Sequence, residues 1–168
     1  VRNVGFLAAM NPTLFRAIVR PKLYRDNRKN GHTDPEDVHE DSIWRMKYNE
    51  DLFKKYSSLF YGDANEELKI KLRGYEFSRP WGIADGFDKK AEVLGSLSYC
   101  GLGYIPFGTV PDTARIGNER IRIAVDESSG TMWNAQGFPS PGPDEVERNV
   151  ASYVRDYPKN EQLPLIAS

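Results

Sequence analysis

Strand-like and helix-like segments alternate along the second half of this 168-residue chain, and their order limits the possible fold more than any other feature. Apolar runs cover Trp81–Ala84 and Gly103–Val110, and another begins at Leu163. Helical patterns separate them at Glu92–Cys100 and Asp144–Tyr157. Such alternation predicts an α/β chain whose strands form a parallel sheet with right-handed crossovers.

The first part of the chain has a helical pattern instead. Residues 1 to about 30 carry apolar side chains at helical spacing, with basic residues among them, and Pro21 is expected to kink or end the helix. Such a segment can lie on an anionic membrane surface, or it can pack as a terminal helix on the protein's own body. Asp34–Glu36 (Asp-Pro-Glu) is typical of a helix start. We expect that helix to include His39 and Met46, and a second, short helix to end at Lys54–Ser58.

A β-hairpin is expected between these two parts. Leu68–Leu72 alternates apolar and basic residues, Arg73–Gly74 turns the chain, and Tyr75–Phe77 returns. We therefore expect two domains, a helical segment over residues 1–66 and a strand-containing part over residues 67–168.

The segment from Gly82 to Glu92 (Gly-Ile-Ala-Asp-Gly-Phe-Asp-Lys-Lys-Ala-Glu) combines small and charged residues where a strand should give way to a helix. A glycine there lets a planar ligand approach the backbone, as at the C-terminal end of a barrel strand. Lys89 is the strongest candidate for a site residue, because a fixed cation can stabilise an anionic product. The alternative is an ordinary turn with a glycine for geometry and a lysine in water.

A second segment, Met132–Gly142, holds an amide, two glycines and two prolines, and predicts an irregular loop before the next helix. In order and spacing, these two segments, together with Phe107–Val110 (Phe-Gly-Thr-Val), resemble the dihydroorotate dehydrogenase family. Asp34–Glu40 resembles the Asp-Pro-Glu-x-Ala-His segment of the membrane-associated, quinone-dependent class. The resemblance spans most of the chain.

The resemblance implies an N-terminal helical segment followed by the first part, about three strands, of a (β/α)8 TIM-type barrel. A complete barrel takes about 250 residues, so the chain is expected to be truncated. The implied enzyme oxidises dihydroorotate to orotate with FMN and passes electrons to quinone. The helical segment would contact the membrane and form the quinone entrance, which implies a membrane-associated protein at the mitochondrial inner membrane or the cytoplasmic face of a bacterial membrane. The hairpin would plug the N-terminal end of the barrel.

Site residues are also implied by the resemblance. The residues that would approach or bond FMN are Ala84, Asp85, Gly86, Lys89 and Thr109. Those that would contact the substrate are Lys89, Asn134, Ala135, Gln136, Gly137 and Phe138. His39 would line the quinone pocket, although a lone helix histidine can also be a solvated or capping side chain. The catalytic base is expected beyond Ser168, and no metal pattern is present.

Several positions depart from the family pattern. Asp85 stands where alanine is usual, Ala135 and Val125 where arginine is usual, and Lys90 and Pro139 where asparagine is usual. A carboxylate at Asp85 would repel an anionic reduced flavin. These departures favour an alternative, a non-catalytic relative that serves as a membrane-associated structural subunit of a larger complex. Three strands would leave an open barrel edge, which a protein partner could cover.

Composition excludes other classes of function. The net charge of −1 provides no field that would attract nucleic acid. Cys100 is the single cysteine, so no internal disulfide can form, and its position at a helix end favours a core cysteine over a nucleophile. No apolar run approaches the roughly 20 residues that span a bilayer.

Overall fold

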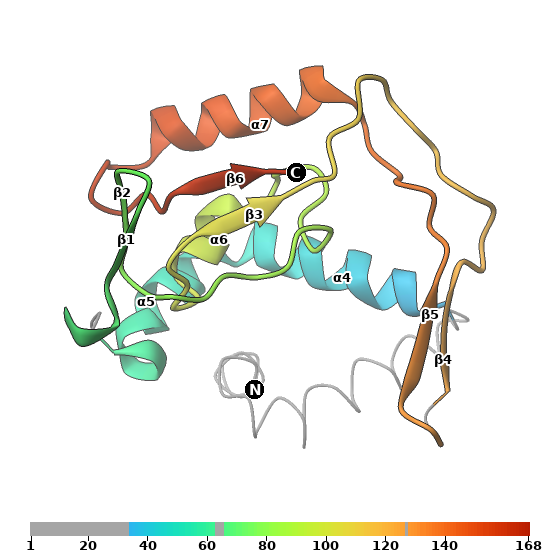
Figure 1. Ribbon diagram of the computed structural model, residues 1–168, viewed down its shortest axis with the longest axis horizontal. Helices are drawn as coiled ribbons and strands as arrows, with labels where there is room; N and C mark the ends of the chain where they lie inside the picture. Colours follow the sequence, from blue (N-terminus) through green and yellow to red (C-terminus); the bar gives the residue numbers. More distant parts are fainter. Residues whose placement is uncertain (1–33, 63–65, 127) are drawn as a thin grey trace. The chain divides into compact units, whose positions relative to one another are not determined.

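The computed structural model describes residues 34–62, 66–126 and 128–168, and these residues form an α/β chain (Figure 1). The elements are α4 (Pro35–Tyr48), α5 (Glu50–Tyr61), a 3-10 turn (Glu66–Leu68), β1 (Ile70–Leu72), β2 (Tyr75–Phe77), α6 (Leu94–Ser98), β3 (Ile105–Phe107), β4 (Ile123–Asp126), β5 (Thr131–Asn134), α7 (Pro143–Asp156) and β6 (Leu165–Ala167). The basic segment expected within residues 1–30 lies outside the described residues. None of the described helices is long and apolar enough to cross a membrane.

The described residues form two compact units. One comprises residues 34–45 and 118–136, and the other comprises residues 46–117 and 137–168. The chain passes from the second unit to the first after Gly117, and it returns at Gly137. The two domains predicted from the sequence, 1–66 and 67–168, follow a different division and stay a prediction.

Parallel strand pairing in the second unit confirms the α/β prediction. Strands β3 and β6 are parallel, with Ile105 opposite Leu165 and Phe107 opposite Ala167. The expected first strand, Trp81–Ala84, is reduced to one parallel bridge between Gly82 and Tyr104. A β-carbon at Gly82 would lie 2.6 Å from the Tyr104 ring, so only glycine allows this approach.

Two other predicted elements are shorter than expected. The strand predicted over Gly103–Val110 is limited to β3, since Gly108 has a φ of +121° that interrupts extended pairing. The helix predicted over Glu92–Cys100 is limited to α6. Its N-terminal boundary follows Asp88, whose carboxylate accepts the backbone N–H groups of Glu92 and Val93.

The core of the second unit lies where α6 packs against α5, α7 and β3. Leu94 and Leu97, three residues apart on α6, are 2% and 1% exposed. Ile105 is 0% exposed, and it and Phe107 are both buried while Pro106 between them is half-buried, as a strand with one buried side predicts. Helix α7 contributes Val146 and Tyr153, and it confirms an amphipathic helix over Asp144–Tyr157, but Val154, which the spacing places on the apolar face, is 53% exposed. The other buried hydrophobic side chains of this unit are Phe77, Ala91, Val93 and Tyr99.

The hairpin expected around Arg73–Gly74 is confirmed in the same unit. Strands β1 and β2 pair antiparallel, with Ile70 opposite Phe77 and Leu72 opposite Tyr75. The turn takes positive φ at both central residues, +51° at Arg73 and +84° at Gly74. Two positive φ values match the twist of a tight hairpin.

The first unit contains the start of α4 and the β4–β5 hairpin. Asp34 caps α4 as predicted, because its Oδ1 accepts the backbone N–H of Glu36 at 2.9 Å. Strands β4 and β5 pair from Ile123–Asn134 to Asp126–Thr131. The irregular loop predicted from Met132 therefore begins only after Asn134, since residues 131–134 form a strand.

Candidate functional site

The turn after the Gly82 bridge has little side-chain cover. The backbone N–H of Phe87 donates to the oxygen of Ala84 at 3.3 Å, and Gly86 takes a φ of +83° within this turn. A β-carbon added at Gly86 would meet no atom within 4 Å. Ala84 and Asp85 are both exposed. The turn thus offers open backbone that a planar ring could approach.

Asp88 fixes the loop after this turn. Its side chain is almost fully buried, and its two carboxylate oxygens accept the backbone N–H groups of Glu92 and Val93, each at 2.9 Å. Burial raises the pKa of the Asp88 carboxyl, and these two N–H groups oppose that rise. The backbone oxygen of Asp88 accepts the N–H of Gly108 at 3.2 Å. The loop is therefore attached both to the start of α6 and to the end of β3.

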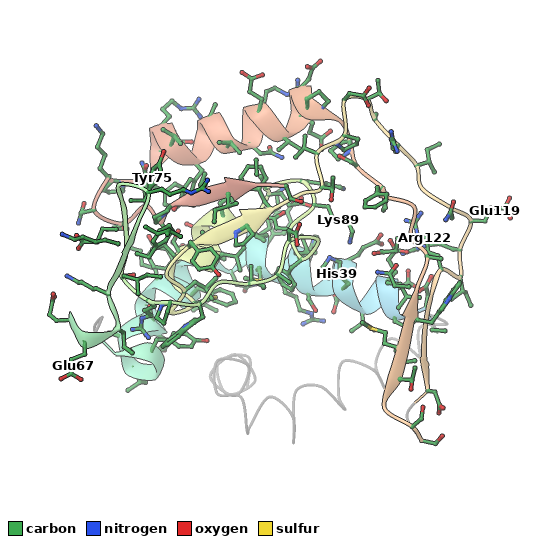
Figure 2. The ribbon with its side chains drawn as sticks, viewed as in Figure 1. His39, Glu67, Tyr75, Lys89, Glu119 and Arg122 are labelled. Atoms are coloured by element: carbon green, nitrogen blue, oxygen red, sulfur yellow. The ribbon has the colours of Figure 1, made fainter. Side chains whose placement is uncertain are left out.

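Lys89 follows Asp88 and lies near the carboxyl ends of β3 and β6 (Figure 2). At these ends, the N–H of Ser168 donates to the oxygen of Phe107 at 3.0 Å, and the N–H of Val110 donates to the oxygen of Ser168 at 2.7 Å. Thr109 stands between the bonded residues 108 and 110, and both Lys89 and Thr109 are half-buried. The structure therefore brings Lys89 and the segment with Thr109 to one end of the parallel strands, while Ala84, Asp85 and Gly86 lie in the turn shortly before Lys89.

The predicted substrate residues other than Lys89 divide between the two units. Asn134, Ala135 and Gln136 belong to the unit with the β4–β5 hairpin, whereas Gly137 and Phe138 belong to the other. The Oδ1 atom of Asn134 accepts the N–H of Gln136 at 2.9 Å. The Nδ2 atom of Asn134 has no partner among the described residues, and the side chain is exposed. It can therefore donate a hydrogen bond to a ligand acceptor.

Glu36 is the centre of a buried ionic cluster that sequence patterns do not predict. Its carboxylate, 3% exposed, accepts a two-bond fork from Arg122, with Nε and Nη2 each at 2.8 Å. The Nε atom of Arg120 lies 3.2 Å away, and Nε2 of Gln136 donates at 2.9 Å. These donors hold the pKa of Glu36 down, the Arg122 hydrogen bonds most of all, at about 2. The side-chain amide of Gln136, a predicted substrate contact, is thus bonded to Glu36.

Replacing Glu36 with glutamine is expected to flatten the pH dependence of stability on the acid side. Because folding lowers this pKa from 4.5 to about 2, the ionised carboxylate contributes stability that is complete above pH 4.5 and is lost as the pH falls through 2. The contribution near neutral pH is on the order of 3 kcal/mol.

Urea unfolding at about pH 7 and about pH 3 measures this effect. The difference in unfolding free energy between wild type and Glu36→Gln should narrow at the lower pH. Glu40→Gln, on the same helix and with a side chain 63% exposed, should follow the wild type. A constant gap between wild type and Glu36→Gln would contradict the assignment.

Two remaining candidates lie elsewhere in the described chain. His39 is on α4 and is half-buried. Cys100 follows α6, and its Sγ donates to the backbone oxygen of Ser96 at 3.2 Å. Burial raises the pKa of the Cys100 thiol to about 12, so almost no thiolate exists at neutral pH. Its placement agrees with a core cysteine.

Within residues 34–62, 66–126 and 128–168, no group of three potential ligands gathers around a metal position.

Comparison with known proteins gives one consistent result. The family model described as dihydroorotate dehydrogenase matches residues 67–168. The chain is 32% identical over 135 residues to dihydroorotate dehydrogenase (quinone) of Gloeobacter violaceus, covering 80% of this chain and 36% of that protein. It is 35% identical over 127 residues to the mitochondrial quinone enzyme of Eremothecium gossypii, covering 74% and 27%.

Among solved structures, the dihydroorotate dehydrogenase of Eimeria tenella in complex with ferulenol superposes with a TM-score of 0.66. The sequence identity is 28%, over 79% of this chain and 35% of that one. The ligand-free enzyme of the same organism gives a TM-score of 0.64 at 27% identity, over 79% of this chain and 37% of that one. The chain therefore spans about a third of the length of the relatives that it matches.

Proposed function

The chain belongs to the dihydroorotate dehydrogenase family, and from this premise we propose that it forms part of a quinone-linked enzyme that oxidises dihydroorotate to orotate. One observation carries the proposal. Asp88 fixes the loop that holds Lys89 at the carboxyl ends of parallel strands, beside the segment that holds Thr109. Active sites of (β/α)8 barrels lie at that end of the strands. The first part of such a barrel is accordingly the architecture that we propose for residues 67–168.

The residues at this end fit FMN. The open backbone at Gly86 and the small side chain of Ala84 leave room for a ring, Lys89 supplies a positive charge, and Thr109 supplies a hydroxyl group. When bound, FMN supplies a hydride acceptor. We propose that Ala84, Asp85, Gly86, Lys89 and Thr109 hold it. Asp85 is exposed, so its carboxylate has room to lie away from a ring at Gly86.

The charge of the substrate explains the other assignments. Dihydroorotate and orotate are both carboxylates, and the ammonium group of Lys89 can pair with that charge. Asn134 can donate from Nδ2 to a ring oxygen, since its Oδ1 is already bonded to the N–H of Gln136. Oxidation removes a hydride from C6 and a proton from C5 of the substrate. We propose that the residue that takes the proton lies outside residues 34–168, and that Ala135, Gln136, Gly137 and Phe138 line the substrate.

We further propose that residues 1–66 form the quinone-associated and membrane-associated part, with His39 at the quinone pocket. This proposal draws on the quinone-dependent relatives and on the basic amphipathic pattern of the first 30 residues. It places the protein at a membrane, mitochondrial or bacterial. A protein partner could cover the other edge of β6, since among the described strands β6 pairs with β3 alone.

Purification of the intact protein from its source tests the function. It should be yellow from bound flavin and should reduce a ubiquinone analogue when dihydroorotate is added. Recovery of this chain in a colourless complex, with no dihydroorotate oxidation, would support the alternative of a structural subunit. The exposed acid Asp85, in a position where the family generally has alanine, is the observation that favours that alternative.

A further inference from the structure

We propose that Glu36 is a positioning residue that holds Asn134–Gln136 in the conformation that binds substrate. It acts through Arg122 and Gln136, and the proposal rests on the proposed function because it takes Asn134 as a substrate contact. All of these residues, and the contacts that join them, lie within the same unit.

The cluster is built to hold one geometry. Glu36 receives four hydrogen bonds, two from Arg122 and one each from Arg120 and Gln136, so both of its carboxylate oxygens are fully used. The side chain of Arg122 is only 10% exposed. A two-bond fork between a buried carboxylate and a buried guanidinium fixes direction as well as distance. Helix α4 is thereby connected to a strand more than eighty residues away in the sequence.

Arg122 transmits this constraint to Ala135 and Gln136 of the Asn134–Gln136 segment. Its backbone oxygen accepts the N–H of Ala135 at 2.8 Å, and its Nη1 atom lies 3.4 Å from the backbone oxygen of Gln136. The same Nη1 donates to the oxygen of Asn118 at 2.8 Å. Asn118 in turn donates from its N–H to Gln136 and from Nδ2 to the oxygen of Ala135. The residue after Arg122 is the strand partner of Asn134.

Loss of the Glu36 charge should therefore loosen this segment. Without the Glu36 carboxylate, the charge of Arg122 would be buried without that anionic partner, which costs free energy. Opening of the β4–β5 hairpin would expose Arg122 to water and remove this cost. Arg120 would be affected less, since it also contacts Asp37 at 2.9 Å and Glu40 at 3.2 Å. Glu40 provides a matched control, because Glu40→Gln is the same chemical change one helical turn away, on a side chain that is 63% exposed.

The test compares Glu36→Gln and Glu40→Gln with the wild type in the intact, flavin-loaded protein. Amide hydrogen exchange at Ala135 and Gln136 without substrate reports the conformation, and orotate titration by calorimetry reports the affinity. Glu36→Gln should speed exchange and raise the orotate Kd, each by about tenfold or more, while Glu40→Gln should change each by less than about twofold. Exchange in β3 and β6 and the flavin content should stay unchanged.

If Glu36→Gln fails to fold, the same measurements are made on Arg122→Lys. Lysine keeps the positive charge but cannot form the two parallel hydrogen bonds to Glu36. It should change both readouts in the same direction, and combining the two substitutions should add little beyond the larger single effect. Unchanged exchange in Glu36→Gln would overturn the proposal, and so would faster exchange with unchanged orotate affinity. A wild-type protein that binds no orotate would instead overturn the proposed function and, with it, the substrate role of Glu36. The exchange result would still decide whether Glu36 fixes the segment.

Discussion

In the proposed enzyme, Lys89→Ala is expected to lower kcat/KM for dihydroorotate by about 10²–10³, the cost of removing one electrostatic group at the site. Asp88 fixes the loop that carries Lys89 in two ways. Its carboxylate bonds the two N–H groups just before α6, and its backbone oxygen bonds the N–H of Gly108 just after β3. The backbone that carries the Lys89 side chain is therefore fixed before a ligand binds. Loss of the Lys89 ammonium group removes stabilisation of the developing anionic product, so kcat should fall as well as affinity. Steady-state oxidation of dihydroorotate with a quinone acceptor measures the effect.

The neighbouring lysine provides the control. The side chain of Lys90 is 51% exposed and lies 3.9 Å from Glu92, a distance at which a surface ion pair contributes little. Lys90→Ala should keep kcat/KM within about twofold of the wild type, because surface substitutions away from a site have small effects. Flavin absorbance should be recorded for both variants, so that lost turnover can be separated from lost cofactor. Equal activities of Lys89→Ala and Lys90→Ala would exclude the role assigned to Lys89.

Elements with a local signal could be predicted from the sequence. The Asp-Pro-Glu start of α4, the Arg73–Gly74 hairpin and the apolar face of α7 each depend on residues a few positions apart. Strand lengths could not be predicted in the same way. Gly108 ends β3 early through its positive φ. The segment around Gly82 comes close to Tyr104 but forms only one bridge with it, and no full strand.

Long-range pairing explains what was missed at the site. A hairpin is compatible with the alternation in Ile121–Val125 and with the Ser-Ser-Gly before Thr131. Motif matching alone predicts a loop in this region. Nothing in the sequence pairs Glu36 with Arg122, because charged residues far apart in the chain have no periodic relation. A glutamate in the first turn of a helix is explained well enough by the helix dipole. Only the fold shows that it is buried.

Asp88→Ala is expected to destabilise the protein by about 2–4 kcal/mol, because it leaves one buried and one partly buried N–H group without an acceptor. Those groups belong to Glu92 and Val93, immediately before α6, and Val93 is 2% exposed. For a chain of this size, such a loss corresponds to a fall in Tm of about 5–15 °C. Differential scanning calorimetry of the intact protein measures it. Flavin should also be held less tightly, since the loop with Lys89 loses its attachment to α6.

Asp112→Ala provides the comparison for this measurement. Its carboxylate is 85% exposed and lies 3.9 Å from Arg115, so removing it should change the unfolding free energy by less than about 0.5 kcal/mol. Asp88→Asn should fall between the two, because an amide oxygen can accept one of the N–H groups while its nitrogen faces the other. If Asp88→Ala melted at the wild-type temperature, Asp88 would not be the residue that fixes the loop. Among the described residues, Asp88 is the side chain that accepts the N–H groups of Glu92 and Val93. A different interaction would then have to fix the position of Lys89.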